Sequence, residues 1–160
     1  MTEEKEACGG GLIFGEVTEL SANIDDMTGE DLGAAMEILL AEGALDVWFE
    51  HIQMKKNRPA VKLSLLVPPA ERERFAELTL RHTTTLGVRM KTMERAVLER
   101  GTRIVPTRFG ELRFKQALSG KKVVREMAEY DDIRKIAADT GLPMSEIRRM
   151  VAEDEKIQTL

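Results

Sequence analysis

Residues 45–67 read LDVWFEHIQMKKNRPAVKLSLLV, and this stretch predicts two antiparallel strands joined by a polar turn. In its second half the apolar residues Val61, Leu63 and Leu65 occupy every second position. That period is typical of a strand with one buried face. The first half alternates more weakly, and the turn at residues 55–59 contains Asn and Pro, which favour turns.

A helix is predicted on each side of this hairpin. Before it, Thr28 with Asp31 three residues later is typical of a helix N-cap, and the following apolar residues keep helical spacing until Gly43 ends the run. After it, residues 71–81 form a second run of helical spacing, with Phe75 on the inner face.

Two further strands complete the pattern. Residues 13–23 are rich in apolar and β-branched side chains, and a long strand is expected from Leu86 onward. The order over residues 13–98 is therefore βαββαβ, which predicts an α+β fold of the ferredoxin-like class, with both helices on one face of an antiparallel sheet.

The remaining chain is expected to extend this fold. Residues 102–108 and 111–116 predict an added β-hairpin, and helices are expected at 130–139 and 144–153. The expected organisation is a flexible leader at 1–12, a ferredoxin-like domain with its hairpin at 13–120, and a C-terminal helical segment at 121–160.

Composition excludes several classes of protein. The 160 residues carry a formal charge of −4, which disfavours general binding of nucleic acid. Cys8 is the only cysteine, so an intrachain disulfide and a cysteine-built zinc site are excluded, and a cytosolic location is expected. No apolar run reaches the length of a signal-peptide core or a membrane span.

Three polar segments are expected to meet at one edge of the predicted sheet. They are residues 23–26 after the first strand, 55–58 after the second, and 83–85 with Arg89 before and within the fourth. In the usual ferredoxin-like strand order, 4-1-3-2, the first two strands end at the edge where the fourth begins. The fold therefore predicts that segments far apart in the sequence converge.

The side chains at this edge suit a nucleotide bound together with a metal ion. Two adjacent carboxylates and an Asn amide are oxygen ligands of the kind that Mg²⁺ and Mn²⁺ prefer. Lysine and arginine bind phosphate, and threonine hydroxyls can complete its hydrogen bonds. The same arrangement suits phosphoryl or nucleotidyl transfer, where catalysis is mostly positioning and charge neutralisation.

Each segment also has a purely structural interpretation. The carboxylates can stabilise the N-terminus of the following helix through its dipole, the basic run can be a solvated hairpin tip, and the threonines can mark a helix end. A non-catalytic ferredoxin-like regulatory module that binds a small effector would share this fold without needing a metal. A weak helix-turn-helix pattern at residues 136–151 leaves DNA binding as a third alternative.

The same segments carry a resemblance to a protein family. Asn23–Thr28, Met54–Pro59 and Thr83–Arg89, in this order, resemble signature runs of the C-terminal domain of the LarC family, the nickel-inserting cyclometallases of nickel-pincer nucleotide synthesis. Gly43–Val47 and Ala128–Asp132 are also similar to the family. The resemblance covers nearly the whole chain.

The resemblance implies a reaction that the residues alone do not indicate. The family uses CTP with Mn²⁺ or Mg²⁺ to activate pyridinium-3,5-bisthiocarboxylic acid mononucleotide, and it inserts nickel, the substrate metal, to make the cofactor of lactate racemase. The C-terminal domain is the nucleotide-binding part and is expected to form trimers or hexamers. Complete members also carry a long N-terminal domain, so this chain is expected to be only one part of an enzyme of the lyase or chelatase class.

Carried onto this sequence, the resemblance fixes the segments of the site, and within them we infer three sets of site residues. The metal ligands are expected among Asn23, Asp25, Asp26 and Glu30. The nucleotide-binding residues are expected to be Lys55, Lys56, Asn57, Arg58, Thr83, Thr84, Thr85 and Arg89. Lys55, Lys56 and Asp26 are the expected catalytic residues.

Overall fold

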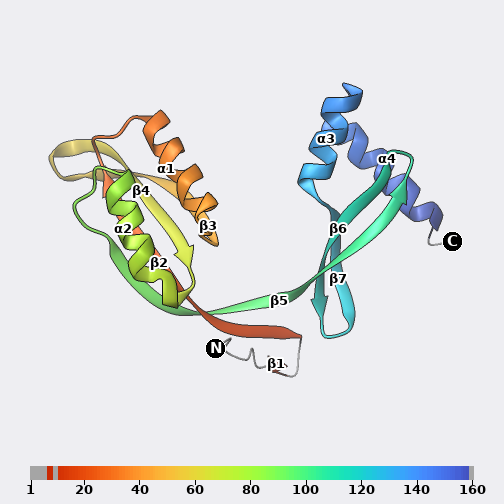
Figure 1. Cartoon of the computed structure of the whole chain (residues 1–160), viewed down its shortest axis with the longest axis horizontal. Coiled ribbons are helices and arrows are strands. Elements are labelled where there is room, and N and C mark those ends of the chain that lie inside the picture. Colours follow the sequence, from red (N-terminus) through yellow and green to blue (C-terminus); the bar gives the residue numbers. More distant parts are fainter. Residues whose placement is uncertain (1–6, 9–10, 159–160) are drawn as a thin grey trace. The chain divides into compact units, whose positions relative to one another are not determined.

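The structure, a computed structural model, describes residues 7–8 and 11–158 and is drawn in Figure 1. Its strands are β1 (Ala7–Cys8), β2 (Leu12–Ile24), β3 (Asp46–Met54), β4 (Arg58–Val67), β5 (Arg89–Thr107), β6 (Gly110–Ser119) and β7 (Lys122–Ala128). Its helices are α1 (Gly29–Ala41), α2 (Arg72–His82), α3 (Tyr130–Thr140) and α4 (Met144–Gln158), with short 3₁₀ turns η1 (Lys55–Asn57) and η2 (Pro69–Glu71).

The chain divides into two compact units. Residues 15–95 form one, which we call the ferredoxin-like unit. The described residues before Gly15 and after Arg95 form the other, which we call the hairpin–helix unit. Strands β2 and β5 each contribute residues to both units.

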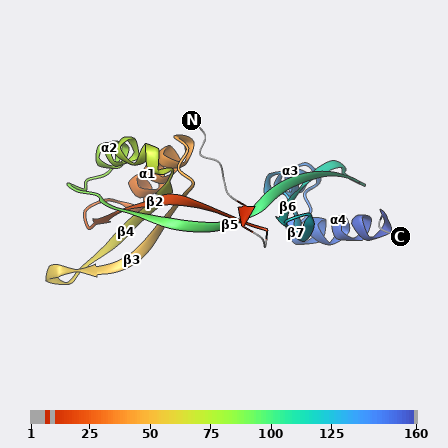
Figure 2. The same cartoon turned by 90° about the horizontal axis from the view of Figure 1, so that it is seen from below.

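The ferredoxin-like unit has the expected topology. Its strands lie in the order β3-β4-β2-β5, which is the 4-1-3-2 order of the fold read from the other edge. Strand β4 pairs antiparallel with both β2 and β3, and the hydroxyls of Thr18 on β2 and Thr92 on β5 lie 2.9 Å apart. Helices α1 and α2 cover one face of this sheet (Figure 2). The α+β ferredoxin-like prediction is confirmed.

The core of this unit follows from the alternation in the sequence. Leu63 and Leu65 of β4 are fully buried, as are Leu20 of β2, Leu39 of α1 and Phe75 of α2, which is 1% exposed. Burial of one such side chain stabilises a fold by roughly 1.5–3 kcal/mol. This core fixes the sheet edge at which the polar segments lie.

The hairpin–helix unit has a separate core. Strands β5, β6 and β7 pair antiparallel in that order, and α3 and α4 pack on them around buried side chains. That core consists of Val105, Leu112, Phe114, Ile133, Ile147 and Val151. Gly141 separates the two helices in a left-handed conformation, with φ of 72°, which ends α3 at the expected place.

Three features differ from the sequence-based expectation. Residues 89–107 form one strand and not two, and β7 lies where a helical segment was expected to begin. Ala7–Cys8 pair with the start of β2, whereas the rest of the expected leader at residues 1–6 and 9–10 lies outside the described residues.

None of the helices in the described part of the chain combines the length and apolar character needed to cross a membrane.

Candidate functional site

The three polar segments are joined to one another at the predicted edge of the ferredoxin-like unit. Arg58 donates from Nη1 to Asp25 Oδ2 at 3.0 Å, which connects the start of β4 to the end of β2. Arg89 donates from Nη2 to Asn23 Oδ1 at 2.6 Å, which connects the start of β5 to the same segment. We call this group of residues 23–26, 55–58 and 83–89 the polar edge.

A third contact closes the polar edge. The hydroxyl of Thr84 donates to Asp26 Oδ1, and the backbone N–H of Thr84 points to the Met27 sulfur at 3.4 Å. Asp25 and Asp26 are therefore bound by different segments, one by the β3–β4 turn and one by the loop after α2. Neighbouring carboxylates are thus held by one cation and one hydroxyl.

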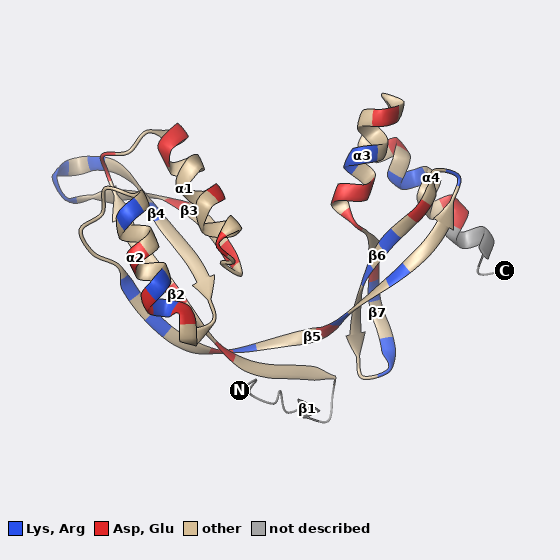
Figure 3. Ribbon diagram, viewed as in Figure 1, with Lys and Arg blue, Asp and Glu red and all other residues tan. Residues whose placement is uncertain are grey.

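The turn between β3 and β4 presents two lysines. Lys56 and Asn57 have positive φ values of 63° and 55°, a left-handed conformation that is uncommon for residues other than glycine. Lys55 and Lys56 are exposed, and neither forms an ion pair with any residue in the described ranges. The blue turn beside β3 and β4 in Figure 3 shows this concentration of basic residues.

The threonines divide into two roles. The Thr83 hydroxyl donates to the Thr79 carbonyl at 2.7 Å, and that of Thr85 donates to the Gly87 carbonyl at 3.0 Å, so both shape the loop that follows α2. Among the three, Thr84 alone has its hydroxyl on a carboxylate. Leu86 in this loop is 99% exposed.

Glu30 lies apart from the contacts described so far. It occupies the first turn of α1 and is exposed, where its charge favours the helix N-terminus. Among the described residues, no three His, Cys, Asp or Glu side chains lie close enough together to hold a metal ion by themselves. A metal bound by one or two carboxylates of the polar edge would take its remaining ligands from other oxygen atoms, such as the phosphates that usually share Mg²⁺ with protein carboxylates.

An open depression of about 430 Å³ adjoins the polar edge. Asp26 and Thr84 line it together with Met27, Ile38, Arg81 and His82. From the sequence, His82 had no metal-ligand spacing and was interpreted as a structural or surface residue, and Arg81 was not singled out. Their position in the sequence could have indicated them, because both residues lie in the last turn of α2, immediately before the three threonines.

Arg113 and Lys115 alternate along one strand, which from the sequence left open whether they add to the basic patch or lie on an exposed sheet face, and both lie in the hairpin–helix unit. Arg113 donates from Nη2 to Asp132 Oδ1 at 2.6 Å, and Lys115 lies 3.3 Å from Glu129. Each already has an acidic partner within its own unit.

His51, the other histidine of the chain, is exposed on β3.

Comparison with known proteins identifies the family to which this chain belongs. A family model described as nickel insertion protein matches residues 10–148, which is most of the chain. The chain belongs to the nickel insertion protein family. The LarC resemblance expected from the sequence is confirmed.

A solved structure supports the same family assignment, and a second one has a similar fold. The structure described as LarC2, the C-terminal domain of a cyclometallase involved in the synthesis of the NPN cofactor of lactate racemase, in its apo form, is 36% identical. It superimposes with a TM-score of 0.83 over 89% of this chain and 99% of that one. A structure from Methanopyrus kandleri is 28% identical with a TM-score of 0.65, covering 88% of each chain.

Curated relatives in the nickel insertion protein family are longer proteins. A putative nickel insertion protein of Enterococcus faecalis is 41% identical over 85% of this chain but only 41% of its own length. The pyridinium-3,5-bisthiocarboxylic acid mononucleotide nickel insertion protein of Geobacillus kaustophilus is 39% identical over 86% of this chain and 33% of its own length. The chain thus spans about a third to two fifths of the curated relatives that it matches.

Proposed function

We propose that this chain is the nucleotide-binding part of a nickel-insertion enzyme and that its polar edge binds CTP with Mn²⁺ or Mg²⁺. The observation that carries the proposal is that Asn23, Asp25 and Asp26 are hydrogen-bonded to two other segments of the polar edge. Beside them lie two lysines that have no acidic partner among the described residues. A triphosphate–metal complex needs this mixture, because the metal bridges carboxylate and phosphate oxygens while cations neutralise the rest.

The basic residues of the polar edge would hold the triphosphate. Lys55 and Lys56 supply charge from an exposed turn, and the backbone of Asn57 continues that turn. Arg58 and Arg89 are already oriented by Asp25 and Asn23, so each presents its guanidinium in a fixed direction. A guanidinium has five donors and can bind a phosphate while it keeps its internal partner.

The acidic residues would hold the metal jointly with the nucleotide. Asp25 or Asp26 would provide a carboxylate, with Asn23 or Glu30 nearby, and phosphate oxygens would fill the other positions. The absence of a closed acidic cluster among the described residues fits Mg²⁺ and Mn²⁺, which are usually bound through one or two carboxylates plus phosphates. A bound divalent ion would supply neutralisation of charge on the phosphates.

In a phosphoryl or nucleotidyl transfer from CTP, the nucleophile would come from the bound substrate, and its bond to phosphorus would form as the bond to the leaving phosphates breaks, with the charges of this unit stabilising the transition state. Lys55 and Lys56 would stabilise negative charge that develops on the leaving phosphates, and Asp26 would position the metal-bound phosphates. Thr83, Thr84 and Thr85 would complete the hydrogen bonds of the phosphates by exchanging the present acceptors of their hydroxyl protons for phosphate oxygens. In this assignment Lys55, Lys56 and Asp26 are the catalytic residues.

The whole enzyme would consist of this chain and the remaining part found in its longer relatives. Nickel would be the substrate metal, inserted into pyridinium-3,5-bisthiocarboxylic acid mononucleotide in a reaction of the lyase or chelatase class. We further propose that the chain acts in the cytosol as a trimer or hexamer. Its family membership and its similarity to a cyclometallase C-terminal domain support the assignment to nickel insertion.

A calorimetric titration with CTP, with and without Mn²⁺, tests the proposal. We expect heat for CTP that increases when Mn²⁺ is present, and less heat for ATP. Heat for ATP but none for CTP would contradict the nucleotide assignment. CTP binding that does not change with Mn²⁺ or Mg²⁺ would favour the effector-binding alternative.

Variants of the β3–β4 turn refine this test. Lys56→Gly removes the side-chain charge, and glycine adopts the positive φ of this position without strain. A change in CTP binding by this variant therefore reports the loss of the lysine contact and not a change in the backbone of the turn. We expect it to weaken CTP binding by roughly 1.5–3 kcal/mol, the value of one hydrogen bond to a charged group.

The matched control is Lys121→Gly in the β6–β7 turn, which also removes an exposed lysine. It should leave CTP binding unchanged. If both variants bind CTP like the unmodified chain, the triphosphate does not lie at the β3–β4 turn.

A further inference from the structure

A second group of basic residues lies on the strands of the hairpin–helix unit. The β5–β6 register pairs Arg100 with Ala117, and the β6–β7 register pairs Ala117 with Arg125. Residues at paired positions project from the same face of a sheet. Two arginines therefore stand on one face of three neighbouring strands, with a small alanine between them.

The two arginines are available to a ligand. Arg100 and Arg125 are exposed, and neither makes an ion pair with a residue of the described chain. Adjacent strands lie about 4.8 Å apart, so the two Cα atoms are separated by roughly 10 Å across β6. Because a guanidinium binds carboxylate or phosphate bidentately, this pair suits a ligand with two anionic groups held apart.

A cavity lies where these residues meet. It has a volume of about 320 Å³, and Arg100, Ala117 and Arg125 line it with Leu98, Lys115 and Met127. This volume is at the lower end of the range for small-molecule sites, about 300–1,000 Å³. The site is therefore large enough for a ligand the size of a mononucleotide and too small for a long chain.

The middle of the cavity is apolar. Ala117 leaves space above the central strand, and Leu98 and the 59%-exposed Met127 flank it. Methionine adapts its shape to flat aromatic rings and makes favourable sulfur–aromatic contacts. A register shift between Ala117 and Leu118, where β7 has an extra residue, interrupts the regular pairing beside this point. Such bulges commonly redirect side chains near binding sites.

We propose that this cavity, the arginine cavity, binds a flat heteroaromatic ligand that carries an anionic group at each end. Arg100 and Arg125 bind the two anionic groups, and the ring lies over Ala117 against Met127. The proposal rests on the proposed function in one respect. The mononucleotide in the name of the Geobacillus relative has this chemistry, because its ring bears thiocarboxylates and its other end a phosphate.

The test uses nicotinic acid mononucleotide, a pyridine ring with a carboxylate at one end and a phosphate at the other. It is titrated calorimetrically into the full chain at low salt. We expect saturable binding, weakened about tenfold or more by Arg100→Gln and by Arg125→Gln, since each removes a charge-assisted hydrogen bond. Ala117→Leu, which fills the middle of the cavity, should also weaken binding while both arginines remain.

The matched control is Arg134→Gln on α3, another exposed arginine of the same unit without an ion-pair partner in the described ranges. It should bind the probe like the unmodified chain. An equal loss of probe affinity in Arg134→Gln would show that the probe is attracted only by the positive charges of the unit, which would overturn the proposal. Absence of probe binding, or saturable binding of single-stranded RNA that competes with the probe, would overturn it as well.

This result is separable from the assignment of CTP to the polar edge. Each variant is also titrated with CTP and Mn²⁺. Normal CTP binding with no probe binding contradicts the arginine cavity alone. Probe binding that depends on Arg100 and Arg125, in a chain that binds no CTP, supports the arginine cavity and contradicts the proposed function.

Discussion

At the scale of single residues, Thr28 shows how a local sequence signal positions the polar edge. Its hydroxyl accepts a hydrogen bond from the Asp31 backbone N–H at 3.1 Å and donates to the Asp31 carboxylate at 2.7 Å. This N-cap fixes where α1 begins, and α1 follows directly from the carboxylates Asp25 and Asp26. The cap therefore limits the freedom of the segment that carries the candidate metal ligands.

Replacing this cap should lower the stability of the ferredoxin-like unit. We expect Thr28→Ala to reduce its free energy of unfolding by about 1 kcal/mol, because the Asp31 N–H loses its acceptor. Urea unfolding followed by the fluorescence of Trp48, the single tryptophan of the chain, measures this change. Thr28→Ser keeps the hydroxyl and should retain most of the stability, and equal losses in both variants would show that the hydroxyl is not responsible.

Gly11 is a residue that nothing else can replace without strain. Its φ is 76°, and a Cβ atom added there would lie 2.3 Å from the backbone nitrogen of Gly120. We expect Gly11→Ala to destabilise the hairpin–helix unit by more than about 1 kcal/mol, since both the conformation and the space exclude a side chain. Gly15→Ala is the matched control, because no atom lies within 4 Å of its added Cβ. Thermal unfolding of the two variants gives the comparison.

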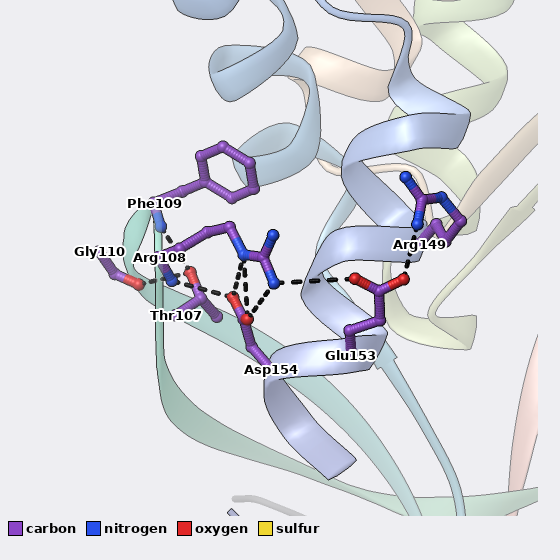
Figure 4. Close-up of polar contacts among 7 residues, drawn as sticks. All are labelled: Thr107, Arg108, Phe109, Gly110, Arg149, Glu153 and Asp154. Atoms are coloured by element: carbon purple, nitrogen blue, oxygen red, sulfur yellow. Dashed lines mark hydrogen bonds and ion pairs between the residues drawn. The ribbon is translucent and has the colours of Figure 1, made fainter. Parts of the chain in front are cut away.

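At the scale of elements, two arginine–aspartate pairs attach the helices α3 and α4 to the strands beneath them. Arg113 on β6 binds Asp132 on α3, with Nη2 to Oδ1 at 2.6 Å. Arg108, after β5, binds Asp154 on α4 through its side chain and its backbone N–H (Figure 4). Glu153 on α4 lies 3.7 Å from the same guanidinium. Hydrogen bonds from the arginines lower the pKa of Asp132 and of Asp154.

These pairs give the hairpin–helix unit a defined response to acid. Because each aspartate has a pKa below its ordinary value of 3.8, its contribution to stability is complete above that value. The contribution is lost as the pH falls through the lowered pKa. We expect the midpoint of thermal unfolding, followed by helical circular dichroism, to fall steeply below about pH 4.

The variant Asp132→Asn with Asp154→Asn is the reference for this measurement. It should be less stable at neutral pH, and its unfolding midpoint should fall less steeply in acid, because the two titrating groups are gone. An unchanged acid dependence would assign the effect to other carboxylates.

Particular elements also show how far the sequence could predict this fold. The β3–β4 hairpin was predictable because one face of β4 is buried and its apolar residues alternate. Strand β7 was not, because Val123 and Val124 are 41% and 49% exposed and no buried face imposes a pattern. A break was expected between the fourth strand and residues 102–108, yet β5 is continuous through Gly101, where an added Cβ would lie 3.0 Å from the Leu118 side chain. Glycine at this position therefore serves close packing within a strand.

The candidate site could be predicted only in part for a related reason. Topology alone brings the ends of β2 and β3 and the start of β5 to one edge, so the convergence of the polar segments followed from the strand order. Which hydroxyl reaches which carboxylate depends on the path of the loop after α2. That path is set by the Thr83 and Thr85 side chains, which bond to nearby carbonyls. Sequence patterns do not encode such a path.

At the scale of the whole molecule, the described residues form two separate buried core clusters, one in each unit, with no member in common. We expect Leu39→Ala and Ile133→Ala each to cost about 2–5 kcal/mol, and each within its own unit. Trp48 fluorescence, which reports the ferredoxin-like unit, should shift in urea for Leu39→Ala and stay nearly constant for Ile133→Ala. Equal shifts in both would show that the units unfold as one.

The division of the chain also has a consequence for the order of its synthesis. The ferredoxin-like unit is continuous, residues 15–95, whereas the hairpin–helix unit needs residues from both ends of the chain. A ribosome therefore completes the first unit while Gly11 still lacks the Ser119–Gly120 turn that it packs against. Because domains generally fold as they emerge, the polar edge can form early, and the arginine cavity can form only after β7 has been translated.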